Sequence, residues 1–165
     1  MRVPLRGAWC EMRPKKLLLD TNIIIDFLHH RDPFFEKARL LMICGRVGEY
    51  NLWISSSQVT DLIFVLTHGG NKKYVPEVLQ KLRTMRLFVN VYPVTDADID
   101  KMLATTWADP EDALLADLAL KMHADAIITR DAEFPHPEGM PVKDCDQFFD
   151  WVRDEFGSSY EDLPI

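Results

Sequence analysis

The chain has 165 residues, of which 47% are hydrophobic and 27% charged, and its formal net charge is −7. This length and composition are typical of one globular domain with a sizeable core. The uninterrupted apolar runs are much too short to span a bilayer, so we expect no membrane segment. The acidic balance excludes a protein that holds nucleic acid by a general positive field, but it does not exclude a nuclease that uses bound cations and a local basic patch.

The cysteines and histidines show no metal-binding pattern. The three cysteines are far apart in the sequence, and the five histidines lack zinc-type spacing. We therefore expect free thiols in a reducing cytoplasm. The basic N-terminus has no continuous apolar core and does not form a secretory signal. We expect residues 1–15 to be a flexible extension, residues 16–156 to form the domain, and residues 157–165 to be an acidic tail.

The domain is organised around its first apolar run, Leu17–Leu19, which stops at Asp20 and is followed by Thr21 and Asn22. This pattern predicts a buried strand, with Thr21 or Asn22 capping the next helix. Ligands of open parallel sheets sit outside the carboxyl ends of the strands, so Asp20 is placed where chemistry usually occurs. The alternative interpretation is that Asp20 only starts a turn or caps the helix.

The rest of the chain alternates between helices and strands. In chain order we expect a helix over 23–30, a helix from 32 to about 45 or 48, a strand over 50–54, a helix over 55–66, a helix over 72–86, a strand over 88–92, a helix from 95 to about 106, a helix over 109–122, a strand over 126–128, a short strand from 142 and a helix over 144–156. This order predicts an α/β sandwich with a central, mainly parallel sheet of about five strands.

The helix over 55–66 carries a second candidate acid. Ser55 and Gln58 have the spacing of a capping box. Apolar residues then occupy nearly every direction around the helix, which predicts burial on nearly every side. Asp61 would be a lone charge in that environment, and it would cost several kcal/mol unless something paired with it.

Four carboxylates from four elements are expected to converge at one end of the sheet. Asp20 and Asp131 each follow an apolar strand run, Asp112 begins the buried face of its helix, and Asp61 belongs to the helix over 55–66. Two like charges about 4 Å apart repel by roughly 4 kcal/mol at an effective dielectric near 20. A divalent cation such as Mg²⁺ removes that repulsion, and bound cations activate water and stabilise charge on a phosphodiester.

Each acid also has a simpler interpretation. Asp112 lies in the first turn of a helix, where the dipole favours any acid, and Asp131 can form an Asx-turn. Asp117 precedes Lys121 by four residues, which favours a surface ion pair. The remaining nearby acids are most simply capping or solvated charges, with an outer-shell role open for the last: Asp26, Asp96, Asp98, Asp109, Glu111 and Glu133.

Two blocks of the sequence resemble one family. The segment from Leu17 through Asp20, Thr21 and Asn22 to Leu28 is similar to the opening of a PIN domain. The segments 109–119 and 124–134, the second of which contains Thr129-Arg130-Asp131 and ends in Phe134, are similar to its second half. The likeness spans about residues 16–155.

The resemblance implies a Rossmann-like α/β/α sandwich and a Mg²⁺- or Mn²⁺-dependent ribonuclease. By position it implies that Asp20, Asp61, Asp112 and Asp131 form the acid cluster, that Asn22 and Thr129 support it, and that Asp20, Asp112 and Asp131 hold the metal. Small members of this family resemble VapC-type toxins, which cut RNA, often form homodimers and are silenced by a small antitoxin. The family more usually has Glu where this chain has Asp61, so Asp61 is expected to reach a cation less directly.

Local basic groups are expected to orient the RNA backbone, and the candidates are Arg130, Lys72 and Lys73. A second hypothesis is a catalytically silent PIN-like module that binds RNA or a protein through the same face. A third is a metal-dependent phosphatase of an unrelated α/β fold, although such enzymes typically need an acid at the position of Asn22.

Overall fold

The computed structural model describes residues 15–157 and residue 160. Residues 1–14 of the predicted N-terminal extension and most of the predicted tail lie outside these residues, whereas Lys15 belongs to the first strand. The domain is built on a five-stranded parallel sheet with the order β3–β2–β1–β4–β5. The strands are β1 (Lys15–Leu19), β2 (Tyr50–Ser55), β3 (Val89–Tyr92), β4 (Ala126–Ile128) and β5 (Val142–Lys143). The predicted sandwich with a parallel central sheet is therefore confirmed.

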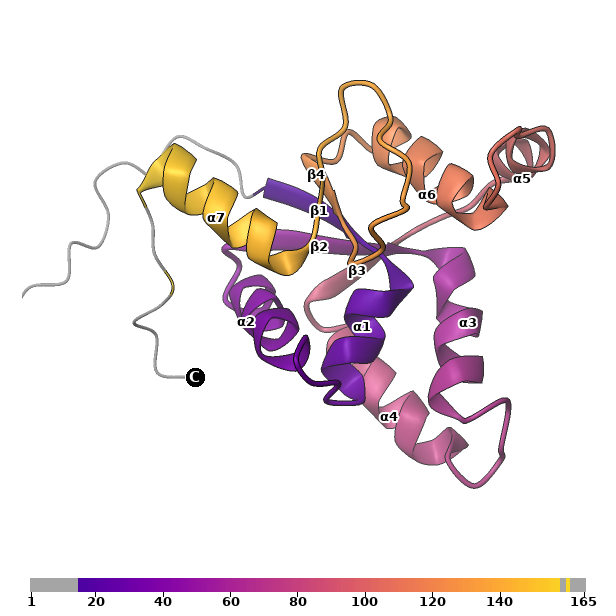
Figure 1. The fold of residues 1–165 in the computed structure, drawn as a ribbon. Helices are drawn as coiled ribbons and strands as arrows, with labels where there is room; N and C mark the ends of the chain where they lie inside the picture. The colour runs from indigo at the N-terminus through magenta and orange to yellow at the C-terminus, as the bar shows by residue number, and fades with distance from the viewer. Residues whose placement is uncertain (1–14, 158–159, 161–165) are drawn as a thin grey trace, which may run out of the picture.

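Helices connect the strands in the expected order. They are α1 (Thr21–Leu28), α2 (Phe35–Arg46), α3 (Ser56–Leu66), α4 (Val75–Met85), α5 (Asp96–Leu103), α6 (Pro110–Lys121) and α7 (Cys145–Phe156). Figure 1 shows α5 and α6 on one side of the sheet and α1, α2 and α4 on the other. In the described part of the chain, no helix has the length and apolar character needed to cross a membrane.

The central strand β1 is buried on both faces because successive side chains of a strand point in opposite directions. Leu17 and Leu19 belong to the larger core, together with residues of α1, α2, α3, α4 and α7. Leu18 points to the smaller core and packs there with residues of α6, β4 and the loop after it. This explains why the strand reads as a continuous apolar run rather than an alternating one.

The carboxyl ends of β1 and β4 lie side by side at the centre of the sheet. Leu17, Leu18 and Leu19 are in register with Ala126, Ile127 and Ile128. The Asp20 N–H continues this ladder by donating to the Ile128 carbonyl oxygen at 2.9 Å. The first and second halves of the chain therefore meet where both strands end.

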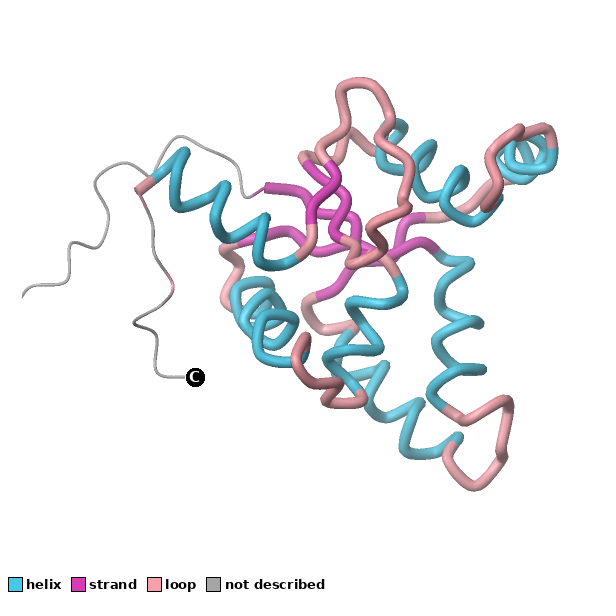
Figure 2. Tube along the Cα trace, in the orientation of Figure 1, coloured by secondary structure: helices cyan, strands magenta, loops and turns pink. Residues whose placement is uncertain are grey.

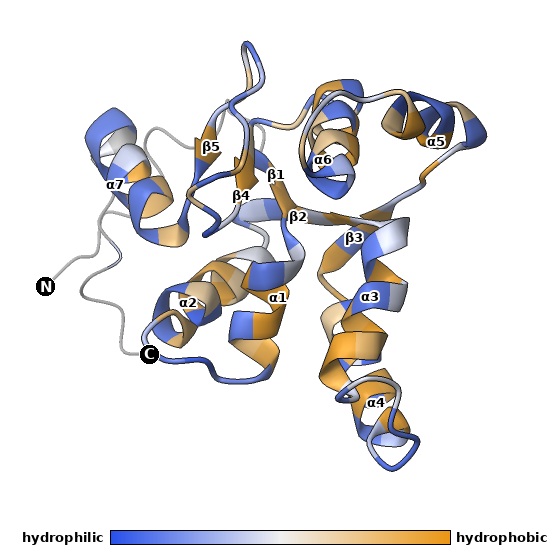
Figure 3. Cartoon of the chain, turned by 45° about the vertical axis from the view of Figure 1, so that its right-hand side comes forward, coloured by the Kyte–Doolittle hydropathy of each residue, from blue (hydrophilic) through white to orange (hydrophobic). Residues whose placement is uncertain are grey.

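Four expectations about the helices are wrong. Asp20, and not Thr21 or Asn22, occupies the N-cap position of α1. The lysine-rich helix begins at Val75 rather than Lys72, so Lys72 and Lys73 lie in the turn before it. Helix α5 ends at Leu103, a few residues earlier than expected. Helix α3 is not buried all round, because Phe64 is 60% exposed. Figure 3 shows that apolar colouring extends along the outer part of α3 and α4, which project together from the sheet.

The segment between β4 and β5 is irregular. It runs from residue 129 to residue 141 and is drawn as loop in Figure 2. Phe134 anchors it, because this side chain is 1% exposed and packs in the smaller core. The loop therefore begins at the centre of the sheet edge, where Thr129, Arg130 and Asp131 follow β4 directly.

Candidate active site

Asp20 stands at the junction of β1 and α1. Its backbone is extended, with φ −72° and ψ 155°, and it occupies the N-cap position of α1. The Asp20 Oδ2 atom accepts hydrogen bonds from Asn22 Nδ2 at 2.6 Å and from Thr129 Oγ1 at 2.7 Å. Burial raises the pKa of Asp20, while the hydrogen bond from Thr129 lowers it. The predicted supports, Asn22 and Thr129, are thus brought to this acid.

Asn22 and Thr129 also bind each other and the following residues. Asn22 Nδ2 lies 3.0 Å from Thr129 Oγ1, and Asn22 Oδ1 accepts from the Arg130 N–H at 3.3 Å. Thr129 is 2% exposed and accepts from the Asp131 N–H at 3.0 Å. This network joins the start of α1 to the end of β4, so it fixes the position of the Asp20 carboxylate.

Asp112 enters the site from the first turn of α6. Asp109 caps that helix, with its Oδ1 atom accepting from the Glu111 N–H at 2.8 Å and from the Asp112 N–H at 3.3 Å. The pKa of Asp112 is raised to about 7, first by burial and then by the charges of Asp109, Asp20, Asp131 and Glu111, in that order of importance. Burial and the charge of Asp61 raise the pKa of Glu111. The acids are therefore close enough to oppose one another's ionisation.

Asp131 lies just past β4 on the surface. Its Oδ1 atom accepts from the Glu133 N–H at 2.9 Å, so the simple Asx-turn interpretation is confirmed as a local structure. Its charge nevertheless raises the pKa of both Asp20 and Asp112. The structure therefore brings Asp131 to the same end of the sheet, while leaving its carboxylate accessible.

A cleft of about 490 Å³ opens between α1, α3, α5 and α6. Its polar lining includes Asp20, Asp61, Glu111 and Asp112. Phe64, Val65, Ile99 and Met102 contribute an apolar wall. A concave site that combines apolar walls with several acids of raised pKa is the default candidate for chemistry.

Asp61 is placed differently from what the sequence predicted. It is exposed rather than buried. The apolar neighbours Phe64 and Val65 on α3 are exposed as well, so this side of the helix is not covered. It lines the cleft and faces Glu111, which is itself exposed. Glu111, expected to be a solvated or capping charge, is therefore part of the acidic wall, and the acidic run 109–112 was the available signal for it.

Gln58 is a site residue whose role the sequence analysis missed. The expected capping box forms, with Ser55 Oγ accepting from the Gln58 N–H at 3.3 Å and Gln58 Oε1 accepting from the Ser55 N–H at 2.7 Å. The Gln58 amide group also donates from Nε2 to the Leu19 carbonyl oxygen at 3.0 Å and to Thr21 Oγ1 at 3.1 Å. Gln58 therefore ties α3 to the start of α1 beside Asp20.

The basic candidates separate into two groups. Arg130 lies beside Thr129, and its guanidinium Nε donates to Asp26 Oδ2 at 2.7 Å. Lys72 and Lys73 are exposed in the turn after α3, at the end opposite to Ser56. A helix of 11 residues spans roughly 16 Å, so the structure does not bring these lysines to the acids.

Two ion pairs differ from the sequence expectation. Asp117 does not pair with Lys121; its Oδ1 atom lies 2.6 Å from Lys101 Nζ, whereas Lys121 Nζ lies 2.8 Å from Asp98 Oδ2. Hydrogen bonds from Lys121 and Thr95 lower the pKa of Asp98 to about 2. These pairs join α5 to α6 and so stabilise the far wall of the cleft.

The carboxylates are ligands of the type that hard divalent cations prefer, but their arrangement is not that of a formed metal site. Among the described residues, no group of three or more His, Cys, Asp or Glu side chains is arranged closely enough to hold a metal ion. Burial is the main cause of the raised pKa values of Asp20, Asp112 and Glu111, and the charges of neighbouring acids add to it. Carboxylate oxygens with unsatisfied charge are the donors that Mg²⁺ and Mn²⁺ prefer.

Comparison with protein families decides the identity of the fold. A model described as PIN domain matches residues 16–133, which is well over half of the chain. The chain belongs to the PIN-domain family. The matched region contains β1 to β4 and all four acids named from the sequence, so the family resemblance noted in the sequence is confirmed.

Solved structures support the same fold. The structure of VapBC2 from Rickettsia felis bound to a DNA fragment from its promoter contains a chain that matches this PIN domain with a TM-score of 0.54 and 16% identity, covering 78% of this chain and 98% of that one. The structure of FitAB bound to an IR36 DNA fragment gives a TM-score of 0.56 and 17% identity, covering 78% and 94%. No curated protein matches the sequence.

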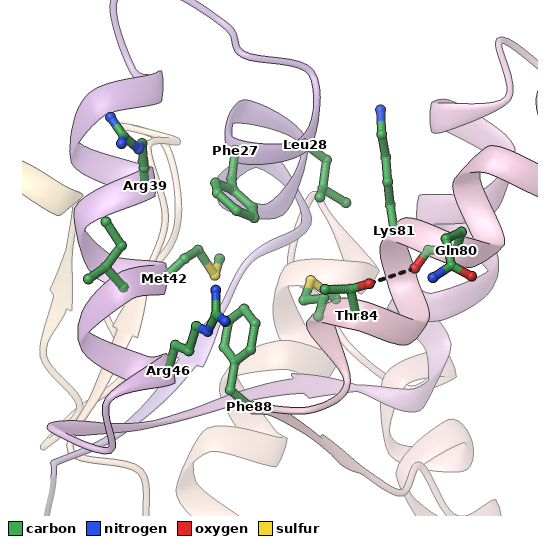
Figure 4. Close-up of a pocket in the computed structure, with 11 residues that line it drawn as sticks. Phe27, Leu28, Arg39, Met42, Arg46, Gln80, Lys81, Thr84 and Phe88 are labelled. Atoms are coloured by element: carbon green, nitrogen blue, oxygen red, sulfur yellow. Dashed lines mark hydrogen bonds between the residues drawn. The ribbon is translucent and has the colours of Figure 1, made fainter. Parts of the chain in front are cut away.

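This PIN domain has a second hollow of about 510 Å³, on the side of α1 away from the acids. Figure 4 shows Phe27, Met42 and Phe88 pointing into it, with Arg46 and Lys81 at its rim. The Thr84 hydroxyl donates to the Gln80 carbonyl oxygen at 3.1 Å, which the dashed line in Figure 4 marks. The hollow shares no lining residue with the acidic cleft, so its chemistry is separate from that of Asp20 and Asp112.

Proposed function

We propose that this PIN domain is an endoribonuclease that hydrolyses RNA phosphodiester bonds with Mg²⁺ or Mn²⁺. Asp20, Asp112 and Asp131 would hold the cation, and Asp61 would act as the fourth acid, through water. The observation that carries the proposal is a cleft whose lining brings Asp20, Asp61 and Asp112 together from three elements. Asp131 follows β4, whose carboxyl end lies beside that of β1. Acids from distant elements therefore share one electrostatic environment at the sheet edge where ligands of this fold class bind.

The bound cation would supply a water of lowered pKa and stabilise the charge that develops on the phosphate. The protein residues do the positioning. Asn22 and Thr129 hold Asp20 through two hydrogen bonds, so this carboxylate is oriented before substrate binds. Gln58 keeps the start of α3, and with it the Asp61 side of the cleft, against the β1–α1 junction.

The proposed activity is tested with the purified chain and a single-stranded RNA. We expect cleavage with Mg²⁺ or Mn²⁺ and none after chelation of the divalent ion with EDTA. Cleavage that continues unchanged in EDTA would contradict the proposal, provided that an RNA-only control shows no loss. Titration of Mn²⁺ by calorimetry provides a second readout that does not depend on the RNA sequence chosen.

We also propose that the protein is the toxin of a toxin–antitoxin pair, with a small antitoxin that covers the cleft. The likeness to chains in the VapBC2 and FitAB structures supports this proposal. Homodimer formation stays a prediction. Co-expression tests the proposal: an adjacent small reading frame should restore growth to cells in which this chain is toxic, whereas no effect on growth in either case would contradict it.

The alternative is a PIN domain that binds RNA or protein without cutting. The Asp at position 61 favours it, because this side chain is shorter than the more usual Glu. Mn²⁺ titration separates the two: unchanged RNA binding with no Mn²⁺ affinity would favour the silent module. Membership of the PIN family removes the third interpretation, a phosphatase of an unrelated fold.

A further inference from the structure

Asp26 is a buried acid that the sequence analysis assigned to the surface. It lies in the last turn of α1 and is 0% exposed, next to Ile23, Ile24 and Ile25, which are also buried. Its Oδ2 atom accepts from Arg130 Nε at 2.7 Å. Its Oδ1 atom is buried and has no hydrogen-bond partner among the described residues, and Arg31 Nη1 lies 3.8 Å away from it.

Stability alone does not explain such a residue. A buried ion pair gives little or no net stabilisation relative to well-packed apolar side chains of similar volume. The three isoleucines before Asp26 show that this part of α1 is otherwise built as core. Of the two arginines near this carboxylate, only Arg130 lies within hydrogen-bond distance, so Asp26 is better explained by what it does to Arg130.

Arg130 is held at three points. Its Nε donates to Asp26, its backbone N–H donates to Asn22 Oδ1 at 3.3 Å, and its guanidinium carbon lies 4.8 Å from the centre of the Phe34 ring. The Arg130 side chain is still 30% exposed, and its two terminal nitrogens have no hydrogen-bond partner among the described residues. The guanidinium is therefore fixed in orientation with its outer edge available.

The free N–H groups of the Arg130 guanidinium could bind a phosphate group. In the chain Arg130 follows Thr129, which binds Asp20, and precedes Asp131, one of the proposed metal ligands. Its side chain lines a separate hollow of about 120 Å³, together with Asp26, Phe34 and Lys37. RNA must approach this acidic edge against the repulsion of its carboxylates, in a chain whose formal net charge is −7. A planar guanidinium with two free N–H pairs binds a phosphate in a bidentate manner, and it does so best when its orientation is set in advance.

We propose that Asp26 is a positioning residue that holds the Arg130 guanidinium ready for a phosphate group of the RNA strand. The inference rests on the proposed ribonuclease function and adds to it the residue that sets the phosphate contact. Asp26 itself touches neither substrate nor cation. Its effect on RNA passes through Arg130, with Phe34 supporting the same guanidinium from its face.

The test uses RNA binding by the full chain in an Asp112→Asn background, which prevents cleavage, with a fluorescent single-stranded RNA as the probe. We expect Arg130→Gln and Asp26→Leu each to weaken binding about tenfold, because one oriented charge-assisted contact is lost. Asp26→Asn keeps an acceptor for Nε and should give an intermediate loss. The double variant Asp26→Leu/Arg130→Gln should bind no more weakly than either single variant.

Matched controls separate positioning from charge and folding. Arg31→Gln removes an arginine beside the same carboxylate, and Arg39→Gln removes one from α2; neither should change RNA affinity. Phe34→Leu, at a side chain that is 45% exposed, should weaken binding in the same direction by less. In the cleaving chain, the Asp26 and Phe34 variants should raise KM while kcat stays nearly constant, which a general loss of folded protein would not do.

The inference is overturned if folded Asp26→Leu binds RNA as tightly as its parent, or if the losses from Asp26→Leu and Arg130→Gln add. If Asp26→Leu does not fold by circular dichroism, Arg130→Gln and Phe34→Leu decide, and unchanged RNA affinity in both overturns it. An unaltered chain that neither binds nor cuts RNA would overturn the proposed function as well. If the unaltered chain cuts RNA normally and the Asp26 variants bind RNA as tightly as their parent, only the positioning role is overturned.

Discussion

Asp20 and Asp112 face the same cleft but are held in opposite ways. Asp20 receives two side-chain hydrogen bonds, from Asn22 and Thr129, which fix its carboxylate. Asp112 receives none of this kind within the described chain, and its pKa is raised to about 7 by burial and by neighbouring acids. The β1–β4 side of the site is therefore pre-organised, whereas the Asp112 carboxylate on the α6 side has no ion-pair partner among the described residues.

This difference separates geometry from charge as contributions to one site. Hydrogen-bonded acids define where a cation would bind, and unsatisfied acids supply the electrostatic drive to bind it. Substitution of Asp20 should therefore reduce cation binding and RNA cleavage more than substitution of Asn22 or Thr129. Changes at Asp112 should also appear in stability, because relief of repulsion favours the folded state.

The largest effect is expected at Asp20. Asp20→Asn replaces a proposed metal-binding carboxylate with a neutral amide. RNA cleavage should therefore fall by more than about 100-fold, which exceeds the loss expected when a residue that only orients a metal ligand is changed. Initial rates with saturating Mg²⁺ measure it. Near-normal cleavage by Asp20→Asn would show that the fixed half of the site is not catalytic.

The hydrogen-bonded supports should give the next largest effect. Thr129→Val removes the hydroxyl that lies 2.7 Å from Asp20 Oδ2 and leaves a side chain of the same shape. We expect a loss of about 10–100-fold in Mn²⁺ affinity or activity, as for other residues that orient metal ligands. Thr84→Val, in α4 and away from the cleft, is the matched control and should change neither quantity.

Substitution of Asp61 should give a smaller effect, and the two variants Asp61→Asn and Asp61→Glu should change the site in opposite directions. Asp61→Asn removes an exposed charge that faces Glu111, so cleavage should fall by less than in Asp20→Asn. Asp61→Glu lengthens the side chain by one methylene and should raise Mn²⁺ affinity if this position acts through water. A loss with Glu as large as that with Asn would show that the shorter acid is already at its working distance.

The unsatisfied charge of Asp112 should appear as a pH effect on stability. Its folded pKa of about 7 lies above the ordinary value of 3.8, so the folded state loses stability as pH rises through that interval. Without divalent ions, the wild type should melt at lower temperature at pH 8 than at pH 5 through this contribution. The melting temperature of Asp112→Asn should fall less between pH 5 and pH 8. Added Mn²⁺ should raise the melting temperature of the wild type at pH 8.

The smallest effect is expected from the distant lysines. The double variant Lys72→Gln/Lys73→Gln removes two positive charges from the turn beyond α3, far from the acids. RNA affinity at moderate salt should therefore change much less than in Arg130→Gln. Fluorescence anisotropy measures both variants under one condition, and equal losses would show that RNA extends along α3.

The sequence predicted the elements that follow local rules. The run Leu17–Leu19 ending in Asp20 identified the central strand, and the spacing of Ser55 and Gln58 identified the capping box that the structure contains. These features depend on hydrogen bonds and burial within a few residues. Their positions could be predicted because no long-range contact had to be known.

Other features depend on partners that are distant in the chain. Asp26 appeared to be a surface charge because Arg130, which pairs with it, is 104 residues away. Asp61 appeared to be buried because a periodic apolar pattern shows which residues are apolar, not whether a neighbouring layer covers them. The Asp98–Lys121 pair was missed for the same reason, since it joins two helices rather than two turns of one.

The sheet order places the boundary between the two halves of the chain at the acidic cleft. Residues up to β3 form one side of the sheet, and β4 and β5 form the other, so the ladder between β1 and β4 is the seam. A cut in the connection after β3 would leave Asp20 and Asp61 on one fragment and Asp112 and Asp131 on the other. Neither fragment would carry a complete set of acids, so a split version of this protein would report on the reassociation of its two pieces.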